Sequence, residues 1–189
     1  MTFTSRKWNI YARYFLKGLF DISERAAENP IVIRNPGIED GSRIWSLACL
    51  SKPLDLNSPY FYLLFCRHFS RTCLIAEKNS HLLGFVLAYR PPQAESVIFV
   101  WQIAVLPDAR KQGLGRTLLR ELLRRAGSGA RYIEATVTPS NQASRSLFLS
   151  LASELETACE ERPFLGRNIF PEEERHEEEI LLSLGPLPR

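Results

Sequence analysis

The ten residues from Val97 to Leu106 constrain the fold more strongly than any other part of this sequence, because Gln102 is the only polar side chain among them. A half-exposed strand alternates apolar with polar residues, whereas a strand without that alternation is usually covered on both faces. A few residues later, leucines recur at helical spacing from Leu114 to Ala126, with arginines on the opposite side. The sequence therefore predicts a buried central strand followed by an amphipathic helix that packs on its sheet.

Shorter patterns predict the remaining elements. Apolar and β-branched runs bounded by turn residues predict strands over 31–33, 72–77, 82–89, 132–137 and 179–184. Helical periodicity predicts helices over 38–50, 59–68 and 140–152, and Ser58-Pro59 is a favourable start for the second. A polar, Glu-rich connection precedes the last strand. This order predicts an α+β fold with one central, mostly antiparallel sheet flanked by helices.

The length and composition fit one globular domain with an extension. The 189 residues are 45% hydrophobic and 24% charged, which is enough apolar material for a core. The first 28 residues differ, since aromatic side chains such as Trp8 are mixed with basic ones such as Lys7. They are interpreted as a docked amphipathic helix, a dimer-forming arm, a poorly ordered extension or a membrane-surface helix. Asn29-Pro30 marks a boundary, so the main domain is predicted to span 29–189.

Charge, hydropathy and cysteine spacing exclude several classes of protein. The net charge of +3 is small for a nucleic-acid-binding protein, in which basic residues cluster. No apolar run approaches the roughly 20 residues that span a bilayer. The four cysteines form no CxxC pair, which argues against a zinc site. We therefore expect a cytoplasmic protein with reduced thiols, no metal, and no nucleic-acid or membrane partner.

The segment Arg-Lys-Gln-Gly-Leu-Gly-Arg, from Arg110 to Arg116, joins the buried strand to the amphipathic helix. Glycines let backbone amides surround an anion, and a helix N-terminus adds partial positive charge. Arg110, Lys111 and Arg116 supply cations at the same point. On glycine spacing alone, an ordinary turn with surface arginines is the simpler interpretation. The strand–loop–helix context and the clustered cations favour a pyrophosphate site.

This segment resembles the acyl-CoA loop R/Q-x-x-G-x-G/A of the GNAT acetyltransferases, and it matches neither of the GxxxxGK[ST] and GxGxxG loops. The resemblance covers roughly residues 31–189 and implies the GNAT fold, with a splayed sheet. It also implies that the pantetheine of acetyl-CoA lies beside residues 101–105. The backbone amides of residues 103–105 would polarise the thioester carbonyl. The implied cofactor-binding residues are Ile103, Val105, Arg110, Lys111, Gln112, Gly113, Leu114, Gly115, Arg116 and Asn141.

Four other segments resemble the diaminobutyrate acetyltransferases, the GNAT enzymes that open the route to ectoine. They are LDLNSPY at 54–60, FVWQ at 99–102, TVTPSN at 136–141 and HEEE at 176–179. The resemblance implies a homodimer in which the 4-amino group of L-2,4-diaminobutyrate attacks acetyl-CoA directly. The products would be N4-acetyl-L-2,4-diaminobutyrate and CoA. An alkyl ammonium with a lysine-like pKa of about 10.4 must first lose a proton, to a carboxylate or a water chain.

The resemblance places several acceptor-binding residues, each beside a simpler interpretation. Asp55 is the candidate partner of one ammonium group, or a turn residue before a helix. Trp101 would make a cation–π contact, or belong to the core. Thr138 and Asn141 would position the substrate carboxylate or the cofactor, although Asn141 is also a natural helix cap.

His176 and Glu179 would close the substrate pocket, or belong to a solvated acidic run. A regular strand would place them on opposite faces, so both can act only if this stretch is bent or bridges two subunits. Asp55 and Glu179 are the candidate catalytic carboxylates.

One position departs from the GNAT pattern. Many GNAT enzymes carry a tyrosine acid on the helix after this asparagine, and Phe148 stands at the nearest equivalent place. No acid for the departing thiolate is therefore assigned. Two other functions compete: a GNAT enzyme for another small amine, and a non-catalytic acyl-CoA-binding sensor that would bind CoA without releasing thiol when amines are added.

Overall fold

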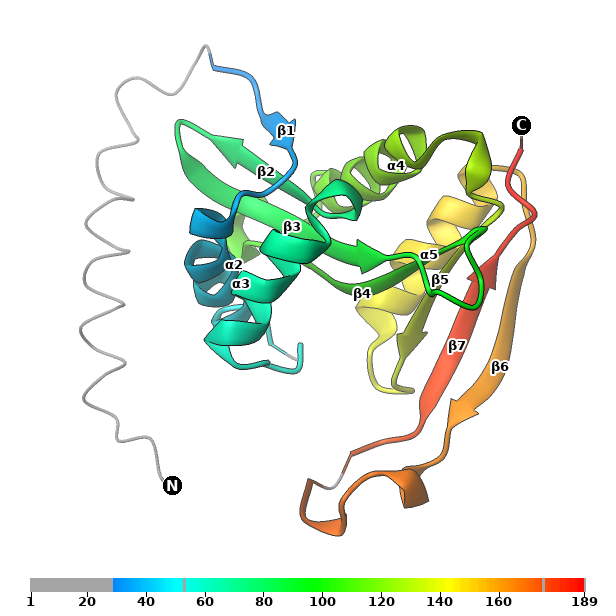
Figure 1. Cartoon of the computed structure of the whole chain (residues 1–189). Coiled ribbons are helices and arrows are strands. Elements are labelled where there is room, and N and C mark those ends of the chain that lie inside the picture. The colour runs from blue at the N-terminus through cyan, green and yellow to red at the C-terminus, as the bar shows by residue number, and fades with distance from the viewer. Residues whose placement is uncertain (1–28, 53, 175, 189) are drawn as a thin grey trace. The chain divides into compact units, whose positions relative to one another are not determined.

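The computed structural model describes residues 29–52, 54–174 and 176–188, and the chain from Val32 onward forms one compact unit. The predicted extension over 1–28 lies outside the described residues, and its role stays a prediction. Seven strands of the described chain form one sheet in the order β1-β2-β3-β4-β5-β7-β6, and every neighbouring pair is antiparallel except β4 with β5 (Figure 1). The strands are β1 (Val32–Arg34), β2 (Leu74–Lys78), β3 (His81–Tyr89), β4 (Val97–Val105), β5 (Tyr132–Val137), β6 (Cys159–Leu165) and β7 (Glu179–Leu184).

Helices cover both faces of this sheet. α4 (Leu114–Ala126) and α5 (Gln142–Glu154) pack on one face, where Leu118 and Leu119 of α4 are fully buried. α2 (Gly41–Cys49) and α3 (Pro59–His68) pack on the other face through residues such as Ile44 and Tyr62. A fully buried leucine contributes roughly 1.5–3 kcal/mol relative to an exposed one, so both layers hold the central strand β4 in place. The predicted α+β fold with a mostly antiparallel, mixed sheet is confirmed.

Local sequence decides where the helices begin and end. The Ser58 hydroxyl accepts a hydrogen bond from the Phe61 amide at 3.3 Å, and Pro59 opens α3. Gly113 precedes α4 with a φ of 78°, and Gly127 follows it with a φ of 67°. Positive φ angles favour glycine, which has no β-carbon. The predicted bounds of α3, α4, β5 and β7 agree with the structure, whereas α5 begins two residues later than predicted.

A β-bulge at Trp101 interrupts the regular alternation of β4. β4 pairs with β3 in one register through Phe99 and Val100 and in a shifted register from Gln102 onward. An extra residue in one strand changes the face on which the following side chains lie. Before the bulge, Ile98 and Val100 pack toward α4 and α5. Trp101 and Gln102 both contact side chains of α3, so these consecutive residues lie on the same face.

The structure contains one strand that the sequence pattern did not predict. β6 lies at the edge of the sheet with most of its side chains exposed. An edge strand needs no apolar face on either side, so its charged residues and Pro163 give no strand signal. Asn79 and Ser80, with φ of 51° and 63°, form a two-residue hairpin turn between β2 and β3.

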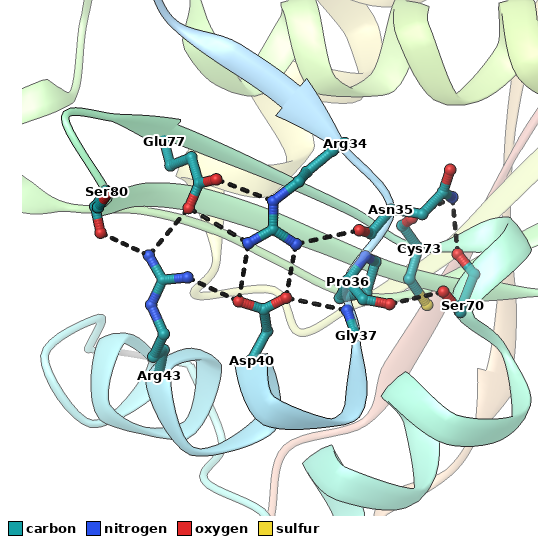
Figure 2. Close-up of polar contacts among 10 residues, drawn as sticks. All are labelled: Arg34, Asn35, Pro36, Gly37, Asp40, Arg43, Ser70, Cys73, Glu77 and Ser80. Atoms are coloured by element: carbon teal, nitrogen blue, oxygen red, sulfur yellow. Dashed lines mark hydrogen bonds and ion pairs between the residues drawn. The ribbon is translucent and has the colours of Figure 1, made fainter.

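Four charged side chains hold β1 and the start of α2 against β2 (Figure 2). Asp40, 1% exposed, accepts hydrogen bonds from Arg34 at 2.7 and 3.0 Å and from Arg43 at 2.6 Å. Both arginines also bond to Glu77 of β2, at 2.8 and 3.0 Å. Burial alone would raise the pKa of Asp40, but the bonds from the arginines and a backbone amide hold it below its ordinary value. The cluster fixes the N-terminal end of α2, whose C-terminal end at Cys49 precedes the segment that carries Asp55.

None of the helices in the described chain combines the length and the apolar character that crossing a bilayer requires. Within the same residues, no three or more His, Cys, Asp or Glu side chains are grouped so as to hold a metal ion.

Candidate active site

β4 and β5 diverge in the middle of the sheet. They pair only over the four residues 97–100 of β4, whereas β4 continues to Val105. The Leu106 amide donates to the carbonyl oxygen of Leu83 across the β3–β4 ladder at 2.8 Å. Residues of an antiparallel ladder alternate between hydrogen-bonded and non-hydrogen-bonded pairs. Ile103 and Val105 therefore direct their backbone groups away from β3, toward the gap that β5 has left.

A cleft of about 610 Å³ opens at this gap, a size typical of small-molecule sites. Nine of the ten predicted cofactor residues line it: Ile103, Val105, Arg110, Lys111, Gly113, Leu114, Gly115, Arg116 and Asn141. Gln112 does not line the cleft, and its side chain donates to the carbonyl oxygen of Asp108 at 3.3 Å. α5 forms a wall of the cleft that was not predicted, although small residues at helical spacing (Ala143, Ser146 and Ser150) were an available signal for it.

The loop into α4 combines oriented amides with nearby cations. Gly113 and Lys111 both have positive φ, 78° and 61°, which turns the chain tightly before the helix. The first amides of an α-helix have no carbonyl partner within it, and they carry the positive end of its dipole. The Arg110 Nε donates to the carbonyl oxygen of Val105 at 3.0 Å, which ties the loop to β4. This arrangement suits a diphosphate group.

A second set of charges lies at the mouth of the cleft, between α4 and α5. Arg116 donates to the Ser150 hydroxyl at 3.3 Å, and its Nε lies 3.2 Å from a carboxylate oxygen of Glu154. Arg120, one turn further along α4, lies 3.1 Å from the other oxygen of the same carboxylate. One anion therefore balances two cations here, which leaves excess positive charge for a negatively charged ligand.

Asp55, His176 and Glu179 come together without lining the cleft themselves; Leu54, which precedes Asp55 in the chain, lines it. The His176 Nε2 lies 3.3 Å from Asp55 Oδ2 and 3.7 Å from Glu179 Oε1. β7 begins only at Glu179, so His176 lies in the connection before the strand. The rule that positions 176 and 179 of a regular strand lie on opposite faces therefore does not hold for this pair. The chain is bent at this point, and one protomer is enough to bring the three groups together.

The orientation of the His176 ring is fixed by its neighbours. Its Nδ1 lies 2.6 Å from the carbonyl oxygen of Glu177, and because a carbonyl can only accept, Nδ1 carries a hydrogen. Nε2 is then directed at the two carboxylates, and Phe170 stacks on the ring at 4.1 Å. The bond to Glu177 raises the pKa of His176, and the Asp55 carboxylate raises it further. A raised pKa favours the imidazolium form, which balances the adjacent negative charge.

Glu179 is the most unusual group of this cluster. Its side chain is 14% exposed, and its Oε2 has no hydrogen-bond partner among the described residues. Burial raises the pKa of Glu179, and the Thr136 hydroxyl and His176 offset only part of that rise. A buried acceptor without a partner, next to a cleft, indicates a ligand-binding or proton-accepting group.

Trp101 is 45% exposed, so it is not the simple core residue that its strand suggested. Its ring lies 5.7 Å from that of Phe61 and 6.5 Å from that of Phe65, both on α3. Trp101 lies on the α3 face, opposite Ile98 and Val100, and part of its indole stays open to a ligand.

Thr138 and Asn141 follow β5. The Asn141 side chain accepts a hydrogen bond from the Ser144 amide at 3.1 Å, so it caps α5 while it also lines the cleft. The Thr138 hydroxyl lies 3.3 Å from that of Ser140, which donates in turn to a carboxylate oxygen of Glu177 at 2.5 Å. These contacts join the end of β5 to the bent segment before β7.

Phe148 and the buried thiols offer no chemistry to the site. Phe148 is 1% exposed and packs in the core below α5. Burial raises the pKa of both Cys66 and Cys73 to about 12, so neither is a thiolate near neutral pH. Neither cysteine is therefore activated as a nucleophile that could form an acyl-cysteine intermediate.

Comparison with known proteins decides the family. Residues 42–152 match the acetyltransferase (GNAT) family. The chain is 44% identical over 179 residues to the L-2,4-diaminobutyric acid acetyltransferase of Halalkalibacterium halodurans, covering 90% of this chain and 94% of that protein. The chain belongs to the diaminobutyrate acetyltransferase family. A second member, from Marinococcus halophilus, is 41% identical over 160 residues, covering 84% of this chain and 92% of that protein.

Solved structures agree with this assignment. The diaminobutyrate acetyltransferase of Paenibacillus lautus, solved with its substrate L-2,4-diaminobutyric acid and coenzyme A, has a TM-score of 0.81 at 40% identity, covering 86% of this chain and 98% of that one. The ribosomal-protein-S18-alanine N-acetyltransferase of Escherichia coli shares the fold, with a TM-score of 0.64 at 20% identity and coverages of 85% and 96%. The predicted GNAT fold, N-acetyltransferase activity and acetyl-CoA cosubstrate are confirmed. The roles of individual residues stay predictions.

Proposed function

We propose that this member of the diaminobutyrate acetyltransferase family transfers the acetyl group of acetyl-CoA to the 4-amino group of L-2,4-diaminobutyrate, giving N4-acetyl-L-2,4-diaminobutyrate and CoA. The observation that carries the proposal is the bend before β7. It brings Asp55, His176 and Glu179 together beside a cleft that also holds a diphosphate-binding loop. The similarity to curated diaminobutyrate acetyltransferases supports the choice of acceptor.

Acetyl-CoA binds with its diphosphate against the amides at the start of α4. Arg110, Lys111 and Arg116 supply the compensating charge. The pantetheine then lies in the gap between β4 and β5. There the backbone amides of Ile103 and Val105 face away from β3, and they stabilise the negative charge that develops on the thioester oxygen.

The acceptor carries two ammonium groups and one carboxylate near neutral pH. Asp55 and Glu179 bind the ammonium groups, and the open face of Trp101 adds a cation–π contact. Thr138 and Asn141 lie just before the start of α5. There they position the substrate carboxylate or the cofactor. These contacts hold the reacting nitrogen against the thioester carbon, which is the main requirement for direct transfer.

Glu179 is the proposed proton acceptor. Burial raises its pKa, and a stronger base takes a proton from an alkyl ammonium more readily. The free amine then attacks the thioester carbon, a C–N bond forms and the C–S bond breaks. The nitrogen loses its second proton, and the CoA thiolate gains one through solvent. His176 holds Asp55 and Glu179 in place during these steps.

We also propose that the enzyme works as a homodimer in the cytoplasm, in ectoine biosynthesis and hence in osmoadaptation. The exposed edge strand β6, with Phe164 at 49% exposure, and the neighbouring Ile169 at 63% support an interface between copies on this side of the sheet. Sedimentation that gives a monomer at working concentrations would contradict the dimer.

The experiment is thiol release from acetyl-CoA with L-2,4-diaminobutyrate, ornithine, lysine and spermidine in parallel, with NMR of the product. Fast turnover with diaminobutyrate and acetylation at N4 is expected. Turnover with another amine alone would keep the GNAT activity and overturn the acceptor. CoA binding without thiol release on adding any amine would instead favour the sensor.

A further inference from the structure

We infer that Gln102 is a positioning residue, which holds the loop of Asp55 at a fixed distance from the strand that carries the thioester. This inference rests on the proposed role of Asp55 in acceptor binding. It concerns a side chain that touches neither the acceptor nor the cofactor in the proposed mechanism. Gln102 would act through the backbone of Asp55.

The geometry joins three elements through two buried polar side chains. The Gln102 Nε2 donates to the backbone carbonyl oxygen of Asp55 at 2.6 Å, and its Oε1 accepts from the Tyr62 hydroxyl at 3.0 Å. Gln102 is 6% exposed and Tyr62 is 0% exposed. β4, α3 and the loop between α2 and α3 are thus linked by one chain of hydrogen bonds.

The bulge makes this contact available. Without an extra residue at Trp101, position 102 would lie on the same face as Ile98 and Val100, toward α4 and α5. A glutamine there would meet an apolar layer, where an unpaired amide is costly. With the bulge, Gln102 turns toward α3 and the loop, and it becomes the one polar side chain in an otherwise apolar strand.

The part of the loop that carries Asp55 is open to solvent, whereas Leu54 before it packs against the core. The Asp55 side chain is 80% exposed, and Leu56 is 50% exposed. Gln102 stands between Trp101, the proposed acceptor contact, and Ile103, whose backbone faces the thioester gap. The Gln102 side chain therefore links the backbone of Asp55 directly to β4, the strand that borders the thioester gap. A displacement of about 1 Å at such a site can cost roughly 100-fold in rate.

The test uses two variants of Gln102. Gln102→Met keeps the length of the side chain but removes both hydrogen bonds. Gln102→Glu places a carboxylate oxygen, which cannot donate, against the carbonyl oxygen of Asp55. We expect kcat/KM for diaminobutyrate to fall about tenfold or more, the factor that one lost hydrogen bond supplies, while the KM for acetyl-CoA stays unchanged. Gln142→Met is the matched control, because Gln142 also donates to a backbone carbonyl, that of Pro139 at 2.7 Å, on the surface of α5. Its kinetics should match the wild type.

A double-mutant cycle separates positioning from general destabilisation. If Gln102 acts through Asp55, Gln102→Met should lower kcat/KM much less in an Asp55→Asn background than in the wild type. An equal loss in both backgrounds, or a KM for acetyl-CoA that rises as far as that for the diamino acid, would overturn the inference. Failure of the wild type to acetylate diaminobutyrate would overturn the proposed function instead, and thiol release measures that separately. Tm and CoA binding of both Gln102 variants show that the fold is retained.

Discussion

Replacing Glu179 with glutamine should stabilise the protein and disable it at the same time. Burial raises the pKa of Glu179 above its ordinary value of 4.5, so the folded state favours the neutral carboxyl. The stability that the neutral form provides is complete below about pH 4.5 and is lost as the pH rises through the raised pKa. A glutamine is neutral throughout. Glu179→Gln should therefore match the wild type in acid and exceed it in stability at neutral pH.

The magnitude follows from the surroundings of the carboxylate. Oε2 is buried without a hydrogen-bond partner among the described residues, so the glutamine amide is unpaired there too and only the burial of the charge is relieved. Leaving a buried polar group unpaired costs about 1–3 kcal/mol, and more when the group is charged. The attraction of His176 and the remaining 14% exposure offset part of this cost. A gain of about 1 kcal/mol is expected, which for a chain of this size raises Tm by roughly 2–4 °C. In the same variant kcat should fall at least about 100-fold, the smallest factor usual for a lost general base.

Thermal unfolding followed by circular dichroism, at neutral pH and near pH 4.5, measures the first effect, and thiol release from acetyl-CoA measures the second. Glu178→Gln is the matched control, because Glu178 precedes Glu179 and is exposed. The wild type should lose kcat/KM as the pH falls through the pKa of Glu179, and the variant should lack that limb. A variant that melts at or below the wild-type Tm at neutral pH, or that keeps kcat within a few-fold, would refute the reasoning.

Three further changes probe other parts of the structure. Gly113→Ala places a β-carbon at a φ of 78°, which costs about 1–2 kcal/mol, and in steady-state kinetics it should raise the KM for acetyl-CoA while that for the diamino acid stays constant. Asp40→Asn leaves two arginines short of a buried partner and should lower the free energy of unfolding by about 3 kcal/mol in urea titrations. That deficit should shrink as the pH falls through the depressed pKa of Asp40, and a constant deficit would contradict the assigned charge. Glu154→Gln releases Arg116 and should lower the KM for acetyl-CoA at low salt; no change would argue against a cofactor role for Arg116.

Features that depend on neighbouring residues were predictable from the sequence. Ser58-Pro59 sets the start of α3, and Gly113 and Gly127 bracket α4, because capping and positive φ are local requirements. The cofactor side of the site follows the same logic, since its cations and amides lie within one loop. Six of the nine predicted residues that line the cleft belong to this loop and the first turn of α4.

Features that depend on distant pairing were not predictable. The edge strand β6 exists because β7 offers it a partner, and its own side chains give no apolar pattern. The bend that joins His176 to Glu179 depends on where β7 starts to pair. The bond from Gln102 reaches a carbonyl 47 residues away, and the bulge that directs it appears only in the register of β3 with β4. Strand periodicity alone places His176 and Glu179 on opposite faces and gives no signal for β6.

The divergence of β4 and β5 leaves an unfinished sheet edge inside the folded chain. Extended backbone with free amides readily accepts another extended segment, and the pantetheine arm carries amide groups of its own. A molecule that completes this edge binds the folded state and not the unfolded chain, so it stabilises the fold by about 2.7 kcal/mol at 100 times its Kd. The supply of acetyl-CoA in the cell would then govern how long each copy of the protein survives, as well as how fast it works.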